Sequence, residues 1–219
     1  MSTIPEFKLK HARPLPRSFF LRDPRRVGRD LLGKLIVRKQ GRKILAGRIV
    51  EVEAYLGQDD LAAHAAAGRT ARNEVIFGPP GHAYVYFIYG VHYCLNVSCM
   101  PEGDAGCLLI RALEPIIGIE SMAKARELGD LDFSAPRNLR RLSSGPGMLC
   151  EALEITRERD NGKDLLSDRS DLQIGDDGFR AKKILTTTRI GISKSPGMPL
   201  RYLIEGNAYV SGKQLAISK

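Results

Sequence analysis

Residues 83–97 read Ala-Tyr-Val-Tyr-Phe-Ile-Tyr-Gly-Val-His-Tyr-Cys-Leu-Asn-Val. Their period of two predicts a strand with two different faces, Tyr84, Tyr86 and Ile88 on one and Val85, Phe87 and Tyr89 on the other. Gly90 is free to turn the chain after this strand. An ordinary buried strand is one interpretation, because aromatic residues are common in strands. A tyrosine ring also suits a base drawn out of a nucleic-acid stack, because it joins a flat apolar face to a polar tip.

The segments around this stretch predict a mixed fold. β-branched, alternating segments indicate a hairpin from residues 35–37 and 44–55, and further strands at 107–113, 185–192 and 200–204. Helices are expected at 23–32, 116–128 and 146–153, the first with Asp23 as N-cap and Pro24 in its first turn. No regular β-α-β order appears. We therefore expect an α+β fold, a curved antiparallel sheet with a barrel-like core and surrounding helices.

The chain of 219 residues is predicted to form one compact domain over residues 21–219. Residues 1–18 are polar and contain Pro5, Pro14 and Pro16, which indicates an extended N-terminal arm over residues 1–20. Residues 59–73 are expected to form a loop or weak helix. Residues 157–180 are charged and rich in Gly and Asp, and predict a surface loop with little bearing on function.

The composition favours a polyanionic partner. Lys plus Arg number 34 against 25 for Asp plus Glu, a formal net charge of +9. No signal-like segment or apolar run of membrane-spanning length is present, so we expect an intracellular protein without a membrane partner. The four cysteines contain no Cys-x-x-Cys pair and the four histidines no ligand spacing. We expect reduced, mostly buried thiols and no metal site.

Two carboxylates are placed where they could act in chemistry. In Arg48-Ile-Val-Glu51-Val-Glu53-Ala-Tyr55, alternation puts Glu51, Glu53 and Tyr55 on one face. One interpretation is a solvated strand face. The other is a general base, an acid whose pKa is tuned by burial or by a nearby arginine. Arg111, a charge within an apolar strand, is the candidate for that arginine, although a structural salt bridge would explain it equally.

Spaced motifs over nearly the whole chain from Asp23 resemble the alkyladenine (3-methyladenine) DNA glycosylase family. They are Glu51-Val-Glu53-Ala-Tyr55-Leu-Gly57, then Asp59-Asp60 and His64, Gly68-Arg-Thr70-Ala-Arg72-Asn73, Gly78-Pro-Pro-Gly81-His-Ala-Tyr84-Val-Tyr86-Phe-Ile-Tyr89-Gly90, Asn96, Leu108-Leu-Ile-Arg111-Ala-Leu-Glu-Pro115, Ser144-Gly-Pro-Gly-Met-Leu-Cys150, Arg189-Ile-Gly191 and Pro199-Leu-Arg201-Tyr202. Each motif alone is weak, but their order and number make the resemblance specific.

The resemblance implies a DNA-repair enzyme that flips alkylated or deaminated purines (3-methyladenine, 7-methylguanine, hypoxanthine, ethenoadenine) from double-stranded DNA and hydrolyses the glycosidic bond. It implies that Glu53 activates the attacking water and that Arg111 helps to hold it. Tyr55, His64 and Tyr86 would enclose the flipped base, and Asn96 would exclude guanine. Tyr89 would wedge into the duplex, and Arg69 and Arg72 would contact DNA. No cofactor and no metal are implied, and a monomer is expected.

The chain departs from the family pattern at Ala65-Ala66-Ala67, Ala71 and Met148, where larger, basic or proline residues are usual. These departures put DNA affinity and lesion range in doubt, because basic side chains there would meet phosphates. Strand cleavage would need an amine that forms a Schiff base with the sugar. No lysine occurs in the matched segments, so a monofunctional enzyme is predicted.

Two other interpretations stay open at this point. Residues 142–152 resemble the hairpin of helix-hairpin-helix repair enzymes, with Asp160 or Asp164 as the acid, but the predicted strands argue against that helical fold. A non-catalytic nucleic-acid-binding module of the same fold would explain the charge and the tyrosines, though not the pairing of Glu53 with Arg111.

Overall fold

Two long antiparallel strands, β3 (Lys43–Tyr55) and β6 (Cys107–Ile117), form the middle of the sheet in the computed structural model, which describes residues 12–212. The first half of β3 also pairs with β2 (Leu35–Gln40), and its last residues pair with β9 (Arg201–Ile204). Both edges of β3 are therefore occupied, and every side chain from residue 49 to residue 54 is buried. The expected hairpin over 35–37 and 44–55 is confirmed.

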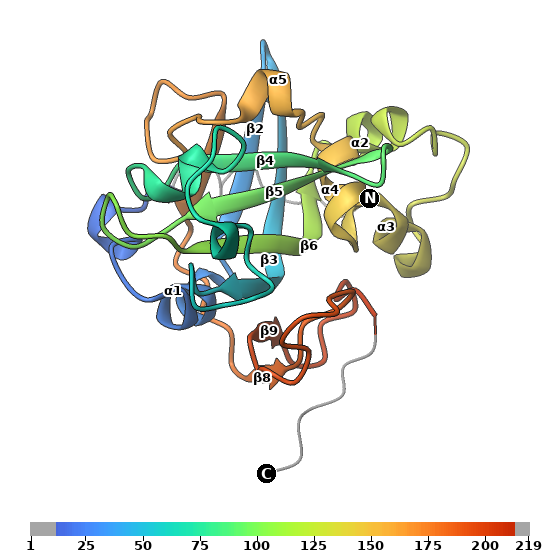
Figure 1. Ribbon diagram of the computed structural model, residues 1–219. Coiled ribbons are helices and arrows are strands. Elements are labelled where there is room, and N and C mark those ends of the chain that lie inside the picture. Colours follow the sequence, from blue (N-terminus) through green and yellow to red (C-terminus); the bar gives the residue numbers. More distant parts are fainter. Residues whose placement is uncertain (1–11, 213–219) are drawn as a thin grey trace.

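Within the described residues the sheet has nine strands, all paired antiparallel, in the order β1-β7-β2-β3-β6-β5-β4, with β9 beside β3 and β8 beside β9. The other five strands of this sheet are β1 (Arg13–Pro14), β4 (Ala83–Ile88), β5 (His92–Ser98), β7 (Leu172–Asp176) and β8 (Ile184–Thr187). The helices are α1 (Pro24–Leu31), α2 (Ile119–Ala125), α3 (Pro136–Ser143), α4 (Pro146–Ala152) and α5 (Arg157–Asp160). The curled sheet and its helices confirm the predicted α+β fold (Figure 1).

The helices cover the sheet unevenly. Helices α2, α3 and α4 gather at one end, where α4 packs on β5 and β6, while α1 lies against β3, β6 and β9 (Figure 1). Apolar side chains from both groups join one core that includes Val27 of α1, Leu95 of β5 and Leu149 of α4. None of the helices in residues 12–212 is long and apolar enough to cross a bilayer.

An irregular register between β3 and β6 determines where Arg111 points. Glu51 is opposite Ala112 and Val52 is opposite Ile110, so Arg111 is an extra residue on β6. A bulge of this kind re-aims the side chain of the unpaired residue. Here it brings Arg111 to the face of β3 that carries Glu51 and Glu53.

Several element boundaries differ from the sequence prediction. Helix α1 with its Asp23 cap and helix α4 are confirmed, and Asp23 accepts a hydrogen bond from the backbone N–H of Arg25. The helix expected at 116–128 is shorter, because β6 continues to Ile117 and Gly118 turns the chain at φ 79°. A Cβ at Gly118 would lie 2.8 Å from the carbonyl oxygen of Ile44, so this turn requires glycine. Helix α3 was not predicted, although Pro136 marks its first turn.

The prediction that residues 157–180 form a surface loop is wrong. They contain α5 and β7, and β7 pairs with both β1 and β2. Their acidic residues neutralise buried arginines of the sheet. Asp160 pairs with Arg38 at 2.6 Å, and Asp177 pairs with Arg48 at 2.9 Å. The charged residues of this segment form ion pairs with distant parts of the chain. Such pairs produce no periodic pattern in the sequence, so the helix and the strand could not be recognised from it.

The predicted N-terminal arm lies partly outside the described residues, which begin at residue 12. Of the remainder, Arg13 and Pro14 form β1 against β7, and Leu15 and Phe20 are buried in the main core. This part of the segment packs against the domain.

Candidate active site

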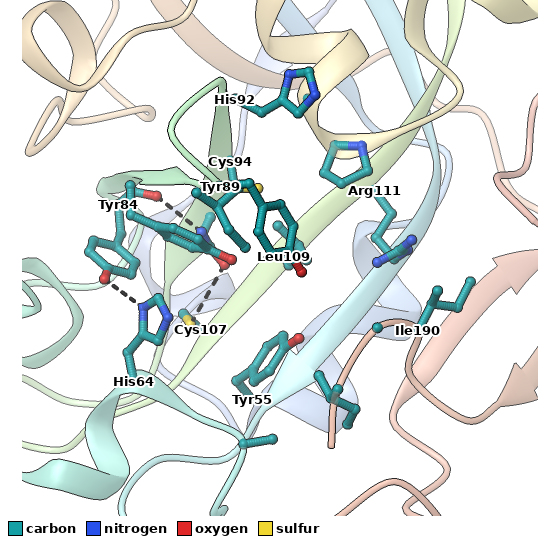
Figure 2. A pocket seen from close by; sticks show the side chains of 18 residues that line it. Tyr55, His64, Tyr84, Tyr89, His92, Cys94, Cys107, Leu109, Arg111 and Ile190 are labelled. Carbon is teal, nitrogen blue, oxygen red and sulfur yellow. Dashed lines mark hydrogen bonds between the residues drawn. The ribbon is translucent and has the colours of Figure 1, made fainter. Parts of the chain in front are cut away.

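A pocket of about 340 Å³ opens between the tyrosine-rich hairpin, the end of β3 and the loop after β8. Its wall includes four of the predicted site residues on three elements and the adjoining loops: Tyr55, His64, Tyr86 and Asn96. Arg111 and Tyr89 line it as well, and Figure 2 shows Tyr55, His64 and Arg111 around one space. The structure thus brings together residues that lie up to 56 positions apart, counted from Tyr55 to Arg111.

Aromatic rings form one side of this pocket. Tyr84, Tyr86 and Ile88 of β4 all line it, as the alternation predicted, while Val85 faces the core. The His64 ring stands edge-on to Tyr86, with centroids 4.5 Å apart. His64 Nδ1 and the Tyr84 hydroxyl are 2.7 Å apart, a contact drawn in Figure 2.

His64 is held as a neutral ring. Burial, with the nearby charge of Arg72, lowers the pKa of its imidazole below the usual 6.5. The hydrogen bond to Tyr84 fixes the orientation of the ring. The wall that a flat ligand would meet is therefore rigid and uncharged.

Glu53 is fully buried and contacts two residues that line the pocket, Arg111 and Tyr55. Its Oε1 accepts a hydrogen bond from the backbone N–H of Ile190 at 2.8 Å and contacts Arg111 Nη1 at 3.1 Å. Its Oε2 accepts from the Tyr55 hydroxyl at 3.1 Å. Burial raises the pKa of Glu53, against the opposing effects of Arg111, the Ile190 amide and Tyr55. A carboxylate oxygen has two acceptor positions, so Oε2 can still accept from a further donor.

Glu51 has a different environment, although it shares a strand face with Glu53. Its Oε1 accepts from Arg111 Nε at 2.9 Å and from Arg201 Nε at 2.6 Å. The backbone N–H and hydroxyl of Ser211 also donate to Glu51, at 2.6 and 2.9 Å. All of these groups are buried. The interpretation of residues 51–55 as a solvated strand face is therefore wrong, because β9 and the segment around Ser211 cover that face.

Asn96 is buried and lines the pocket, and its side chain also forms a hydrogen bond with the backbone of the neighbouring strand. Its Nδ2 donates to the backbone oxygen of Tyr84 at 3.2 Å, across the β4–β5 ladder. Its Oδ1 lies 4.0 Å from Cys107 Sγ. All four cysteines are unpaired and buried, as predicted.

Tyr89 lies at the pocket mouth, in the turn between β4 and β5. It is 81% exposed and adopts a left-handed φ of 55°, which is uncommon for a bulky residue. Gly90 follows at φ 70°. The turn holds a large, apolar ring in solvent, an arrangement that folding alone does not favour.

Basic side chains lie beside this mouth. Arg72 and Lys194 line a groove next to His64. Arg69 instead forms an exposed ion pair with Glu74, so its charge is partly neutralised. Lys194 was not among the predicted residues, because the expected strand 185–192 ends at Thr187 and the chain then loops past the pocket.

The same loop contributes further residues to which the sequence prediction gave no role. Ile190, Gly191 and Ile192 line the pocket, and Arg189 lies behind Tyr55. The Arg189 side chain points inward and forms an ion pair with Asp60. The backbone N–H of Ile190 donates a hydrogen bond to Glu53 and not to a neighbouring strand. The signal for Arg189 in the sequence was its place in the motif Arg189-Ile-Gly191, within a segment expected to be a strand. No cluster of possible metal ligands occurs in the part of the chain that the structure describes.

The helix-hairpin-helix alternative has a partial counterpart. Helices α3 and α4 are indeed joined by a short turn at Ser144 and Gly145. Of its two proposed acids, Asp160 is fully buried against Arg38 and Asp164 pairs with Arg17 at 2.6 Å, and neither lines the pocket. The nine-stranded sheet excludes the helical fold.

Comparison with known proteins agrees with this geometry. The family model described as Methylpurine-DNA glycosylase (MPG) matches residues 18–208. The chain belongs to this family. The matched range includes every residue that lines the pocket, and membership of the family identifies the chain as a DNA glycosylase.

Relatives within the methylpurine-DNA glycosylase family cover almost the whole chain. A protein of Koribacter versatilis named "Putative 3-methyladenine DNA glycosylase" is 62% identical over 211 residues, 96% of this chain and 99% of its own. Proteins with the same name from Carboxydothermus hydrogenoformans and Methanoculleus marisnigri are 44% identical over 199 residues and 45% identical over 201 residues. They cover 91% and 90% of this chain, and 99% and 98% of their own.

Proposed function

We propose that this DNA glycosylase removes alkylated or deaminated purines from double-stranded DNA by hydrolysis and leaves an abasic site. The observation that carries the proposal is Glu53, a fully buried carboxylate that touches two pocket-lining groups, the Arg111 guanidinium and the Tyr55 hydroxyl. The names of the relatives support 3-methyladenine as one substrate.

In this proposal Glu53 is the general base. A water at the floor of the pocket would donate to the free acceptor position of Oε2 and attack C1′ of the flipped nucleotide. Burial raises the pKa of Glu53, which makes the carboxylate a stronger base, and Arg111 keeps it ionised. Arg111 would also orient the water.

The rings would bind the flipped base. Tyr55 and Tyr86 stack on it and His64 closes the pocket edge, while Tyr89 fills the gap left in the duplex. Stacking contributes about 1–3 kcal/mol per base and flipping costs a few kcal/mol, so an aromatic pocket can hold an extruded purine. A damaged purine that pairs poorly costs less to extrude, which favours lesions over normal bases.

Asn96 would exclude guanine by collision with its 2-amino group. Arg72 and Lys194 would bind phosphates next to the flipped nucleotide, whereas the Glu74 partner of Arg69 reduces the charge available there. No lysine lines the pocket among the described residues, which supports hydrolysis without strand cleavage. We further propose that the enzyme acts as an intracellular monomer.

Base release from duplexes with one defined lesion tests the proposal. The wild type should release 3-methyladenine, 7-methylguanine, hypoxanthine or ethenoadenine and leave the strand intact until alkali is added. Glu53→Gln should bind lesion DNA as before and excise about a thousandfold more slowly. A wild type that binds without releasing any base would support the non-catalytic module, and nicking trapped by borohydride would refute hydrolysis alone.

A further inference from the structure

An ion pair that no proposed step uses lies behind the pocket wall. Arg189 Nη1 donates to Asp60 Oδ2 at 2.5 Å and Nη2 donates to Oδ1 at 2.8 Å, and both side chains are completely buried. Nη1 also donates to the backbone oxygen of Ala54 at 3.0 Å. Asp60 accepts from the backbone amides of Leu56 and Ala62, so the pair is rigidly held.

The Arg189 guanidinium lies against a residue of the proposed base-binding wall. Its carbon is 4.6 Å from the centroid of the Tyr55 ring. One face of Tyr55 is therefore covered by a buried cation, while Tyr55 itself lines the pocket. A base that stacks on this ring can use only the other face. The ring thus separates the buried charge from the space for the base.

The charge behind Tyr55 matters for the kind of base in front of it. An aromatic face attracts cations, but a cation already present on the rear face repels a second one through a medium of low dielectric. Asp60 offsets this repulsion. Burial tends to raise the pKa of Asp60, yet the hydrogen bonds and charge of Arg189 lower it overall, so the pair is neutral near pH 7.

We propose that the Arg189–Asp60 pair determines how the enzyme discriminates cationic from neutral purine lesions. The proposal rests on the proposed function. Purines alkylated at N3 or N7 carry a positive charge, and the neutral ion pair allows Tyr55 to accept them. Hypoxanthine and ethenoadenine are neutral, and gain negative charge as they leave. A cation behind Tyr55 without its balancing carboxylate would therefore slow the release of the cationic purines and speed the release of the neutral ones.

Asp60→Asn tests this directly, because it removes the balancing charge and leaves the guanidinium. Single-turnover release of 7-methylguanine and hypoxanthine would be measured in the same duplex sequence. The ratio of the 7-methylguanine rate to the hypoxanthine rate should fall about tenfold, the order expected for unit charges separated by a ring in a buried site. In Asp60→Asn/Arg189→Gln, which has neither charge, the ratio should return to about the wild-type value.

The chain offers a matched control. Arg48 pairs with Asp177 at 2.9 Å and its guanidinium lies 4.2 Å from the Phe179 centroid, but neither charged residue lines the pocket. Asp177→Asn should lower the melting temperature and leave the lesion ratio unchanged. If Asp60→Asn does not fold, Arg189→Gln alone provides the test, because loss of the cation should raise the ratio.

The outcomes separate the two proposals. Equal losses on both lesions in Asp60→Asn, which would leave the ratio at the wild-type value, would show that the pair only stabilises the fold. A wild type that releases neither base would refute the proposed function instead.

Discussion

Arg111 is held by Glu51, whose Oε1 accepts from Arg111 Nε at 2.9 Å, and it presents Nη1 to the neighbouring acid at 3.1 Å. The two carboxylates of one strand face therefore have separate tasks. Glu51 balances two buried guanidiniums, and Glu53 is the one next to the pocket.

The first prediction concerns stability. Glu51→Gln leaves Arg111 and Arg201 buried with less negative charge, and should lower the free energy of unfolding by about 3–5 kcal/mol. Glu53→Gln should change it little or increase it, because burial of this carboxylate is unfavourable. Urea denaturation of both variants measures the difference. Equal destabilisation by the two substitutions would contradict this division of tasks.

The second prediction concerns pH. The pKa of Glu53 is raised by burial, so the acid limb of the excision rate should lie above the ordinary glutamate pKa of 4.5. The folded state also retains the proton to higher pH than the unfolded state. The contribution of Glu53 to stability is therefore fully present below its unfolded pKa and is lost as the pH rises through its folded pKa. Glu53→Gln should remove this decrease, which denaturation at several pH values would detect.

The third prediction uses the strained turn. Tyr89→Asn removes the ring, and asparagine tolerates the left-handed backbone at this position. The melting temperature of the protein should therefore stay unchanged. Excision from a paired lesion should slow about tenfold or more, because nothing fills the gap in the stack. Excision from a lesion in an unpaired loop should change much less. Similar losses on both substrates would rule out a wedge.

The fourth prediction concerns the groove beside His64. Arg72→Ala and Lys194→Ala should each weaken binding to DNA of any sequence, and each should reduce the slope of log affinity against log salt by about one. Arg69→Ala should have a smaller effect, because Glu74 already neutralises that side chain. Binding isotherms at several salt concentrations compare the three variants, and an unchanged slope in the first two would place the phosphates elsewhere.

The fifth prediction concerns Asn96, which bonds the sheet and also lines the pocket. Asn96→Ser should lower the melting temperature, because the Tyr84 carbonyl loses its donor, and should also raise release of guanine relative to hypoxanthine. Both quantities are needed. A lower melting temperature with an unchanged ratio would leave Asn96 a purely structural role.

Local patterns in the sequence were sufficient for the sheet around β3 and β4, because alternation and glycine turns specify strands directly. The resemblance named pocket residues that lie together in the structure, although their roles remain predictions. The loop 189–192 and the separation of Glu51 from Glu53 could not be predicted. Both depend on partners distant in sequence, such as Asp60 for Arg189 and Ser211 for Glu51. The bulge that turns Arg111 toward them is likewise a property of strand pairing.

The bond between Ser211 and Glu51 spans 160 positions of the chain. During synthesis, residue 51 emerges long before the amide that completes its hydrogen bonds, and Arg201 arrives only shortly before that amide. A growing chain can thus form the tyrosine hairpin early, whereas the bonds of Glu51 to Arg201 and Ser211 form only after residues 201–211 have been made. A chain that stops before residue 201 would therefore contain Glu51 and Arg111 without the buried partners that complete their network of ion pairs and hydrogen bonds.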